Sequence, residues 1–196
     1  MCGRFTATVE FSDIRVRWNL DRDLPLYTSR FNIAPEQMSP TIPDIVRYKG
    51  VDRRRCVIPA DGFYEWRKEG KRKVLMWVHL KSKEPFAFAG LWDLWRKPDG
   101  KRVESFTIIT TEPNELIEPI HNRMPVILRP EDEEQWLDAS RTPFVKAKSL
   151  LKPYPEELMD AHDVSPIVNS AKYDGPECIQ PVSDDEIPRA GQLSLL

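Results

Sequence analysis

The 196-residue sequence has few of the residues that build disulfide scaffolds, metal sites or membrane spans. Its three cysteines, at positions 2, 56 and 178, are too far apart for a paired motif, which predicts reduced thiols in the cytoplasm. No His-Glu-x-x-His or glycine-rich phosphate-binding pattern occurs, so we expect no metal and no cofactor. No apolar run approaches the roughly 20 residues of a membrane span, and no signal-peptide pattern is present, so we expect no membrane association.

Charge is nearly balanced overall but unevenly placed. The formal net charge is −2, yet ten Lys or Arg residues stand against four Asp or Glu between Arg47 and Lys73. A local basic stretch can bind phosphates whatever the sum of charges. An ordinary solvated hairpin explains the same pattern, and both interpretations stay open.

Short β-like segments dominate the chain, with a few helical ones between them. The pattern predicts an α+β fold with an irregular β-barrel or sandwich-like core and a few flanking helices. We expect one domain over residues 1–182 and a flexible tail over 183–196. Helices are predicted at 12–19, 130–137 and 142–151, with Ser12 and Thr142 as N-caps. Strands are predicted at 3–9, 30–35, 45–48, 56–66, 74–80, 86–92, 105–111, 126–128, 163–168 and 178–182.

The second residue of the chain has distinctive chemistry. If Met1 is removed, Cys2 carries an amine and a thiol on adjacent carbons. That pair condenses with an aldehyde to a five-membered thiazolidine ring. Reference pKa values are about 7.7–8.0 for an α-amino group and about 8.5 for a thiol, so modest shifts make both nucleophilic near neutral pH. An incidental cysteine behind the initiator is the alternative.

Two further residues are candidate proton carriers. Glu65 stands among aromatic residues on an expected strand, and alternation would turn Phe63 and Glu65 to the same, inward face. Desolvation would then raise the pKa of the Glu65 carboxyl, as suits a proton carrier. His121 precedes an apolar strand and is a candidate general acid or base. An edge glutamate in an ion pair and a structural histidine are the competing interpretations.

Three residues are candidate DNA ligands. The planar guanidinium groups of Arg4 and Arg123 suit phosphates, and Trp66 could stack on an unpaired base. Alternatively, the two arginines form surface salt bridges and Trp66 packs in the core.

Several segments together resemble the SOS-response-associated peptidase family, the abasic-site processing proteins. They are MCGRF at 1–5, RFNIAP at 30–35, RRCVIPADGFYEW at 54–66, FAGLW at 88–92, FTIITTEPN at 106–114, IHNRMPVIL at 120–128 and VSPIVN at 164–169.

The resemblance implies a function in the DNA damage (SOS) response. Cys2, after removal of Met1, would capture the aldehyde of an abasic site in single-stranded DNA as a thiazolidine crosslink that shields the site. By position, Glu65 and His121 match the family's catalytic residues, and Arg4 and Arg123 match its phosphate-binding positions. Affinity would come from phosphates and from stacking on flanking bases, and would weaken with salt.

One segment typical of the family is missing. Members usually carry WGLxPxW-like and INAR-like pieces before the segment at 54–66, whereas here only four residues separate Tyr48 from Arg53. The segment is either deleted from this protein or left out of the printed sequence. A deletion would remove one polar contact and part of the wall that faces DNA.

The C-terminus suggests a partner. Gln192, Leu193, Leu195 and Leu196 resemble the short peptide with which bacterial repair and replication proteins dock on the sliding clamp. A frayed tail is the alternative. Nothing in the sequence predicts an oligomer, so we expect a monomer in the cytoplasm, associated with the nucleoid.

Two other functions remain open. Cys2 and His121 could form a thiol peptidase that removes Met1 or a short leader, although the sequence shows no clear oxyanion hole. Alternatively, the chain is a non-catalytic single-stranded DNA-binding module in which Cys2 takes no part.

Overall fold

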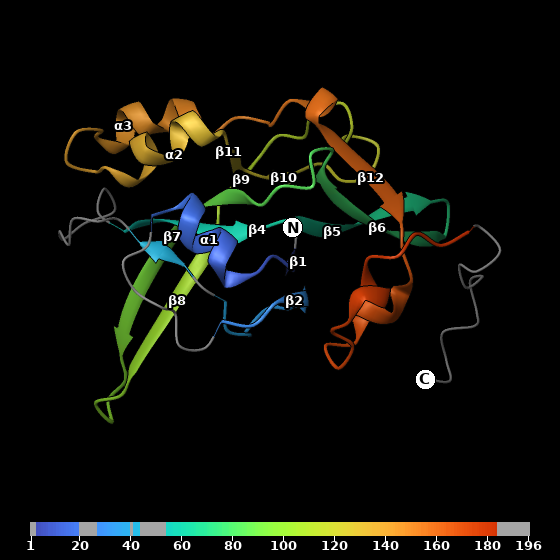
Figure 1. Cartoon of the computed structure of the whole chain (residues 1–196), viewed down its shortest axis with the longest axis horizontal. Coiled ribbons are helices and arrows are strands. Elements are labelled where there is room, and N and C mark those ends of the chain that lie inside the picture. Colours follow the sequence, from blue (N-terminus) through green and yellow to red (C-terminus); the bar gives the residue numbers. More distant parts are fainter. Residues whose placement is uncertain (1–2, 20–26, 40, 44–53, 184–196) are drawn as a thin grey trace.

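The computed structural model describes residues 3–19, 27–39, 41–43 and 54–183, and the description that follows concerns these residues. Two antiparallel sheets make up most of it (Figure 1). The first has the strand order β12-β6-β5-β1-β2 and the second the order β11-β7-β4-β3, with β8 paired to β7; β9 and β10 form a small ribbon. The strands are β1 Arg4–Ala7, β2 Arg30–Ile33, β3 Ile42–Pro43, β4 Arg55–Ala60, β5 Gly62–Glu69, β6 Arg72–Leu80, β7 Phe86–Arg96, β8 Arg102–Ile108, β9 Thr110–Thr111, β10 Met124–Pro125, β11 Ile127–Leu128 and β12 Met159–Asp163.

The main apolar core lies between the two sheets. Phe5 of β1 and Phe63 of β5 both meet Phe88 of β7, with ring centroids 5.9 and 6.1 Å apart in edge-on geometry, the arrangement that aromatic quadrupoles favour. Within the described residues neither sheet closes on itself. The predicted α+β class is confirmed, and its core is a sandwich rather than a barrel.

Helices cover the other face of the second sheet. α1 (Phe11–Arg17), α2 (Pro130–Leu137) and α3 (Phe144–Ala147) are short, and α2 and α3 lie together beside the sheet (Figure 1). Trp136 of α2 is fully buried against this face, and its indole N–H donates to the Cys56 carbonyl at 2.9 Å. None of the described helices is long and apolar enough to span a membrane.

Tight turns join the long strands. Gly70, between β5 and β6, has φ of 61°, and Gly100, between β7 and β8, has φ of 82°. Glycine has no Cβ and so adopts this left-handed region without strain.

Several predicted boundaries are wrong. α1 begins at Phe11 after Glu10, so Ser12 is inside the helix rather than its cap. The helix predicted over 142–151 is reduced to α3 and a 3-10 turn at Lys148–Leu150. The strands predicted at 163–168 and 178–182 are not regular strands. β12 ends at Asp163, the 3-10 turns Pro166–Asn169 and Pro176–Cys178 occupy part of the two segments or border them, and Val164 and Pro181 form only an isolated bridge. Proline at the first position of each turn fixes φ and removes a ladder donor.

The predicted strand at 45–48 and the tail beyond residue 183 lie outside the described residues. The domain boundary at 182 therefore stays a prediction.

Candidate functional site

Glu65 faces inward, as the sequence predicted. It lies on β5, which runs between β1 and β6 in the first sheet. Phe63 packs in the core between the sheets, whereas Tyr64 and Trp66 pack in a separate cluster on the other face. Strand alternation therefore puts Glu65 on the core face, where it is only 2% exposed.

Opposing electrostatic effects act on the pKa of the buried Glu65 carboxyl. Desolvation raises its pKa, and the positive potential of His121 and the backbone amide of Trp66 act in the opposite direction. Its Oε1 atom is buried and has no hydrogen-bond partner in the described part of the chain. A buried oxygen without a hydrogen bond lowers the stability of the fold. A role of Glu65 in catalysis therefore explains its position better than a role in stability does.

A compact turn holds His121. The His121 and Ile120 amides each donate to the Ile117 carbonyl at 2.8 Å, and the Ile117 amide donates to Asn114 Oδ1 at 3.0 Å. Ile117 and Ile120 are buried in the core between the sheets. Apolar packing and backbone bonds therefore fix the end of the turn, where the half-buried imidazole begins.

The contacts of His121 bear on its tautomer. Nδ1 lies 3.1 Å from the Arg123 amide nitrogen and 3.0 Å from the Arg123 carbonyl oxygen. A backbone N–H can only donate. When it donates to Nδ1, the proton of the neutral ring is on Nε2.

Hydrogen bonds to Thr110 hold one side of the exposed Arg123 guanidinium in place. Its Nη2 donates to the Thr110 carbonyl at 2.6 Å and to Thr110 Oγ1 at 2.9 Å, and its Nε lies 3.3 Å from the same Oγ1. These bonds occupy one side of the planar guanidinium and leave Nη1 as a donor that could meet a phosphate.

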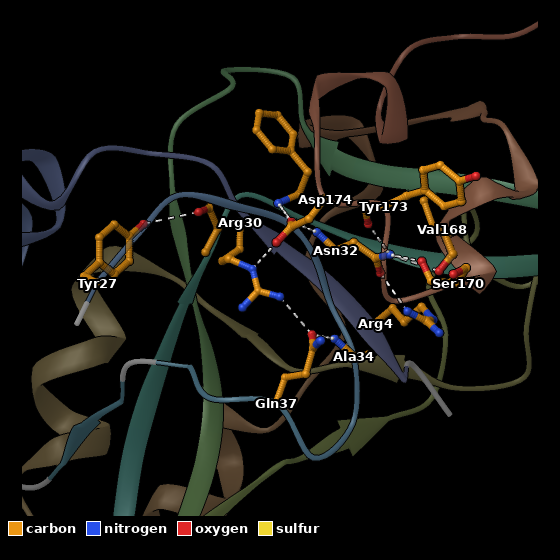
Figure 2. Close-up of polar contacts among 12 residues, drawn as sticks. Arg4, Tyr27, Arg30, Asn32, Ala34, Gln37, Val168, Ser170, Tyr173 and Asp174 are labelled. Carbon is orange, nitrogen blue, oxygen red and sulfur yellow. Dashed lines mark hydrogen bonds and ion pairs between the residues drawn. The ribbon is translucent and has the colours of Figure 1, made fainter.

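Arg4 has a structural role in the fold. Its Nη1 donates to Asn32 Oδ1 and its Nη2 to the Asn169 carbonyl, each at 2.8 Å (Figure 2). Desolvation lowers its pKa, and Tyr64 opposes that effect. Arg4 thus ties β1 to β2 and to the late 3-10 turn.

Asn32 is the centre of that polar network. It is fully buried, and its Nδ2 donates to the carbonyls of Val168, Ser170 and Tyr173 at 3.1, 3.2 and 2.8 Å. Asp174 accepts from the Asn32 amide at 2.9 Å (Figure 2). Sequence reasoning assigned Asn32 no role, although a polar residue inside an apolar strand motif indicates a buried network.

The structure brings some predicted residues together and separates others. Glu65 and His121 interact electrostatically. Trp66 lies on the opposite face of β5 and packs with the cluster that contains Tyr64 and Trp77. Cys2 lies outside the described residues, two positions before β1 begins at Arg4.

The remaining cysteines are unsuited to nucleophilic chemistry. Cys56 and Cys178 are free thiols and fully buried. Burial raises the pKa of the Cys56 thiol to about 12 and that of Cys178 in the same direction, which suppresses the reactive thiolate. Among the described residues, no group of three or more His, Cys, Asp or Glu could hold a metal ion.

Sequence reasoning also missed two supporting residues. Asn114 is buried, and its Nδ2 donates to the Tyr154 carbonyl at 2.7 Å while its Oδ1 starts the turn that ends at His121. Thr110 holds Arg123. Both lie within the segment 106–114, but their sequence gives no sign that they meet residues further along the chain.

Known proteins match this chain over most of its length. The family model described as "SOS response associated peptidase (SRAP)" matches residues 48–171. Abasic site processing protein YoqW of Bacillus subtilis (strain 168) is 40% identical over 222 residues, covering 92% of this chain and 99% of that protein. Abasic site processing protein HMCES of Gallus gallus is 35% identical over 157 residues, covering 69% and 46%. A crystal structure of a protein from Bacteroides thetaiotaomicron has a TM-score of 0.75 at 24% identity, covering 93% and 100%, and supports the fold alone.

The match to YoqW also bears on the missing segment. The two sequences align over 222 residues, more than the 196 residues of this chain, so the relative has residues without a counterpart here. The family resemblance predicted from the sequence is confirmed by both the family model and the relatives. The chain belongs to the SOS response associated peptidase (SRAP) family.

Proposed function

We propose that this protein processes abasic sites by capturing their aldehyde, in single-stranded DNA, through Cys2. The observation that carries the proposal is Glu65, a buried carboxyl that interacts with His121 and has one oxygen without a hydrogen-bond partner in the described part of the chain. Relatives named abasic site processing proteins support the same substrate.

The path of β1 leads to Glu65. Arg4 pairs with Tyr64 and Phe5 with Phe63, so the antiparallel register, continued by one position, puts Gly3, the sequence neighbour of Cys2, opposite Glu65. Two residues span at most about 7 Å, which limits how far Cys2 can lie from Arg4.

The proposed reaction balances without a cofactor. After removal of Met1, the Cys2 amine adds to the aldehyde and the resulting carbinolamine loses water to give an imine. The thiol sulfur then adds to the imine carbon, and the thiol proton passes to nitrogen, which closes the thiazolidine. The net change is loss of one water.

Glu65 and His121 would move the protons. A carboxyl with a raised pKa holds a proton nearer neutral pH than an ordinary glutamate and can give it to the departing hydroxyl. His121, through Nε2, would assist opening of the sugar to its aldehyde form. Arg123, and Arg4 within its network, would face phosphates, and Trp66 would stack on a base beyond the site.

A denaturing crosslinking assay tests the proposal. Single-stranded DNA with one abasic site is mixed with wild-type protein, and the matched DNA has its abasic aldehyde reduced to an alcohol beforehand. We expect a denaturant-resistant adduct only with the aldehyde, and none with Cys2→Ser, whose non-covalent DNA binding stays near the wild-type level. An adduct of equal yield with Cys2→Ser would refute the role of Cys2.

A thiol peptidase activity is the second candidate, because the family model carries that name. If Cys2 removes Met1 itself, the Cys2→Ser protein will retain Met1, as measured by its intact mass. If a separate aminopeptidase removes it, Cys2→Ser will lack Met1 too.

We also propose that the C-terminal residues Gln192, Leu193, Leu195 and Leu196 dock on a bacterial sliding clamp, and that the protein acts as a monomer in the compartment that holds the DNA. A peptide of residues 183–196 should bind purified clamp and lose binding on Leu195→Ala. Equal signals from the two peptides would contradict this docking.

A further inference from the structure

The hairpin formed by β7 and β8 extends beyond the rest of its sheet. β4 pairs with β7 only as far as Leu91, whereas β8 follows β7 to Arg96. The outer part is therefore a two-stranded ribbon that projects from the body (Figure 1). Apart from three half-buried side chains, Leu94, Val103 and Phe106, its residues from Asp93 to Phe106 are exposed.

Positive charge is concentrated at the end of this ribbon. The tip, defined here as residues 95–103, holds Arg96, Lys97, Lys101 and Arg102 against a single acidic residue, Asp99. Arg96 and Arg102 are directly opposite each other across the ribbon. Like charges in opposite positions destabilise a ribbon. Anion binding therefore explains this pair of arginines better than a contribution to stability does.

An exposed aromatic residue accompanies the charges. Trp95 is 55% exposed and lies opposite Val103. Alternation puts it on the same face as Lys97 and Lys101, while Arg96 and Arg102 occupy the other face. A large aromatic ring next to cations is the combination that holds unpaired bases and their phosphates.

The tip has a fixed shape of its own. The Lys97 amide donates to the Lys101 carbonyl and the Gly100 amide to the Lys97 carbonyl, each at 2.9 Å. The Lys101 amide donates to Asp99 Oδ1 at 3.0 Å. The side chains therefore extend from a backbone that is already ordered, which limits the entropy cost of binding.

We propose that the tip binds single-stranded DNA outside the crosslinking site, with Trp95 stacked on a base at one face of the ribbon and Arg96 and Arg102 on phosphates at the other face. This inference rests on the proposed function and adds a second region that binds the same DNA. Charged residues also protect exposed strand edges from aggregation, but that role explains neither the exposed tryptophan nor the opposed arginines.

The experiment compares three variants with a matched control. Arg96→Gln/Arg102→Gln removes two charges, Trp95→Ala removes the ring, and Trp95→Phe keeps an aromatic face. The control, Lys146→Gln/Lys148→Gln, removes two exposed charges in and after α3, away from the tip (Figure 1). Fluorescence anisotropy gives the affinity for long single-stranded DNA, for a short strand that covers only the abasic site, and for duplex.

We expect Arg96→Gln/Arg102→Gln to weaken binding of the long strand only. The salt dependence of log K should fall by about 0.7 for each phosphate that the variant no longer binds. Trp95→Ala should weaken long-strand binding about fivefold or more without changing the salt slope, and Trp95→Phe should restore much of the affinity. The control should match wild type. Thermal unfolding of the arginine variant should be unchanged or at higher temperature, because a repulsion is removed.

Crosslink yield at saturating DNA separates this inference from the proposed function. If the tip proposal fails, long-strand affinity will be the same in all variants while crosslinking persists. Stronger effects on duplex than on the single strand would also overturn it. Absence of crosslinking in wild type would instead refute the proposed function and leave the affinity comparison as the test of the tip.

Discussion

Replacement of Glu65 by Gln should make the protein more stable and less active. Glu65 is only 2% exposed, one carboxyl oxygen has no partner among the described residues, and desolvation raises its pKa. Because the folded state holds the proton more tightly than the unfolded chain, stability is retained at low pH and lost as pH rises through the folded pKa. Every tenfold increase in proton affinity corresponds to about 1.4 kcal/mol of this loss.

Glu65→Gln removes the ionisation and keeps the side-chain volume. We expect equal unfolding free energies near pH 4, where both side chains are largely neutral, and an advantage of about 1 kcal/mol or more for Glu65→Gln at pH 8. Urea denaturation at several pH values measures this difference. The crosslinking rate at neutral pH should fall about 100-fold or more, as expected when an acid–base group is removed. Parallel pH profiles of stability would show that the Glu65 carboxyl is not destabilised by burial, and an unchanged crosslinking rate would exclude it as the proton carrier.

Three further substitutions test the support of the site. Asn114→Ala should cost about 1–3 kcal/mol of unfolding free energy and slow crosslinking because the His121 turn loses its anchor; thermal unfolding and a rate assay check both effects. Arg123→Gln should lower the salt dependence of DNA binding by about 0.7; an unchanged slope in a titration series would exclude a phosphate contact. Gly62→Ala would put a Cβ 2.2 Å from Trp77 Nε1 and should cost about 1–3 kcal/mol; chemical denaturation with wild-type stability would contradict that packing.

The inward orientation of Glu65 could be predicted because strand alternation is a local property. Phe63 fixed the core face of β5, and the same alternation could have shown that Trp66 lies on the other face. The helix at 130–137 was also predictable, because proline at its first position and acidic residues in its first turn are local signals.

The network around Asn32 could not be predicted. The carbonyls that its side chain binds lie 136 to 141 positions away in the chain, and only the packed sheets bring β2 to the turn after β12. The same holds for Asn114 and Tyr154, 40 positions apart. The late 3-10 turns were misjudged because apolar residues suggested strands, while Pro166 and Pro176 decided the local backbone.

Capture of the abasic-site aldehyde by Cys2 can be measured by intact-protein mass spectrometry. The protein is measured alone and after mixing with single-stranded DNA that contains one abasic site. We expect a protein mass without Met1 and, after mixing, a heat-stable species equal to protein plus DNA minus one water. A protein that retains Met1 and forms no such adduct would contradict the claim that Cys2 captures the abasic-site aldehyde.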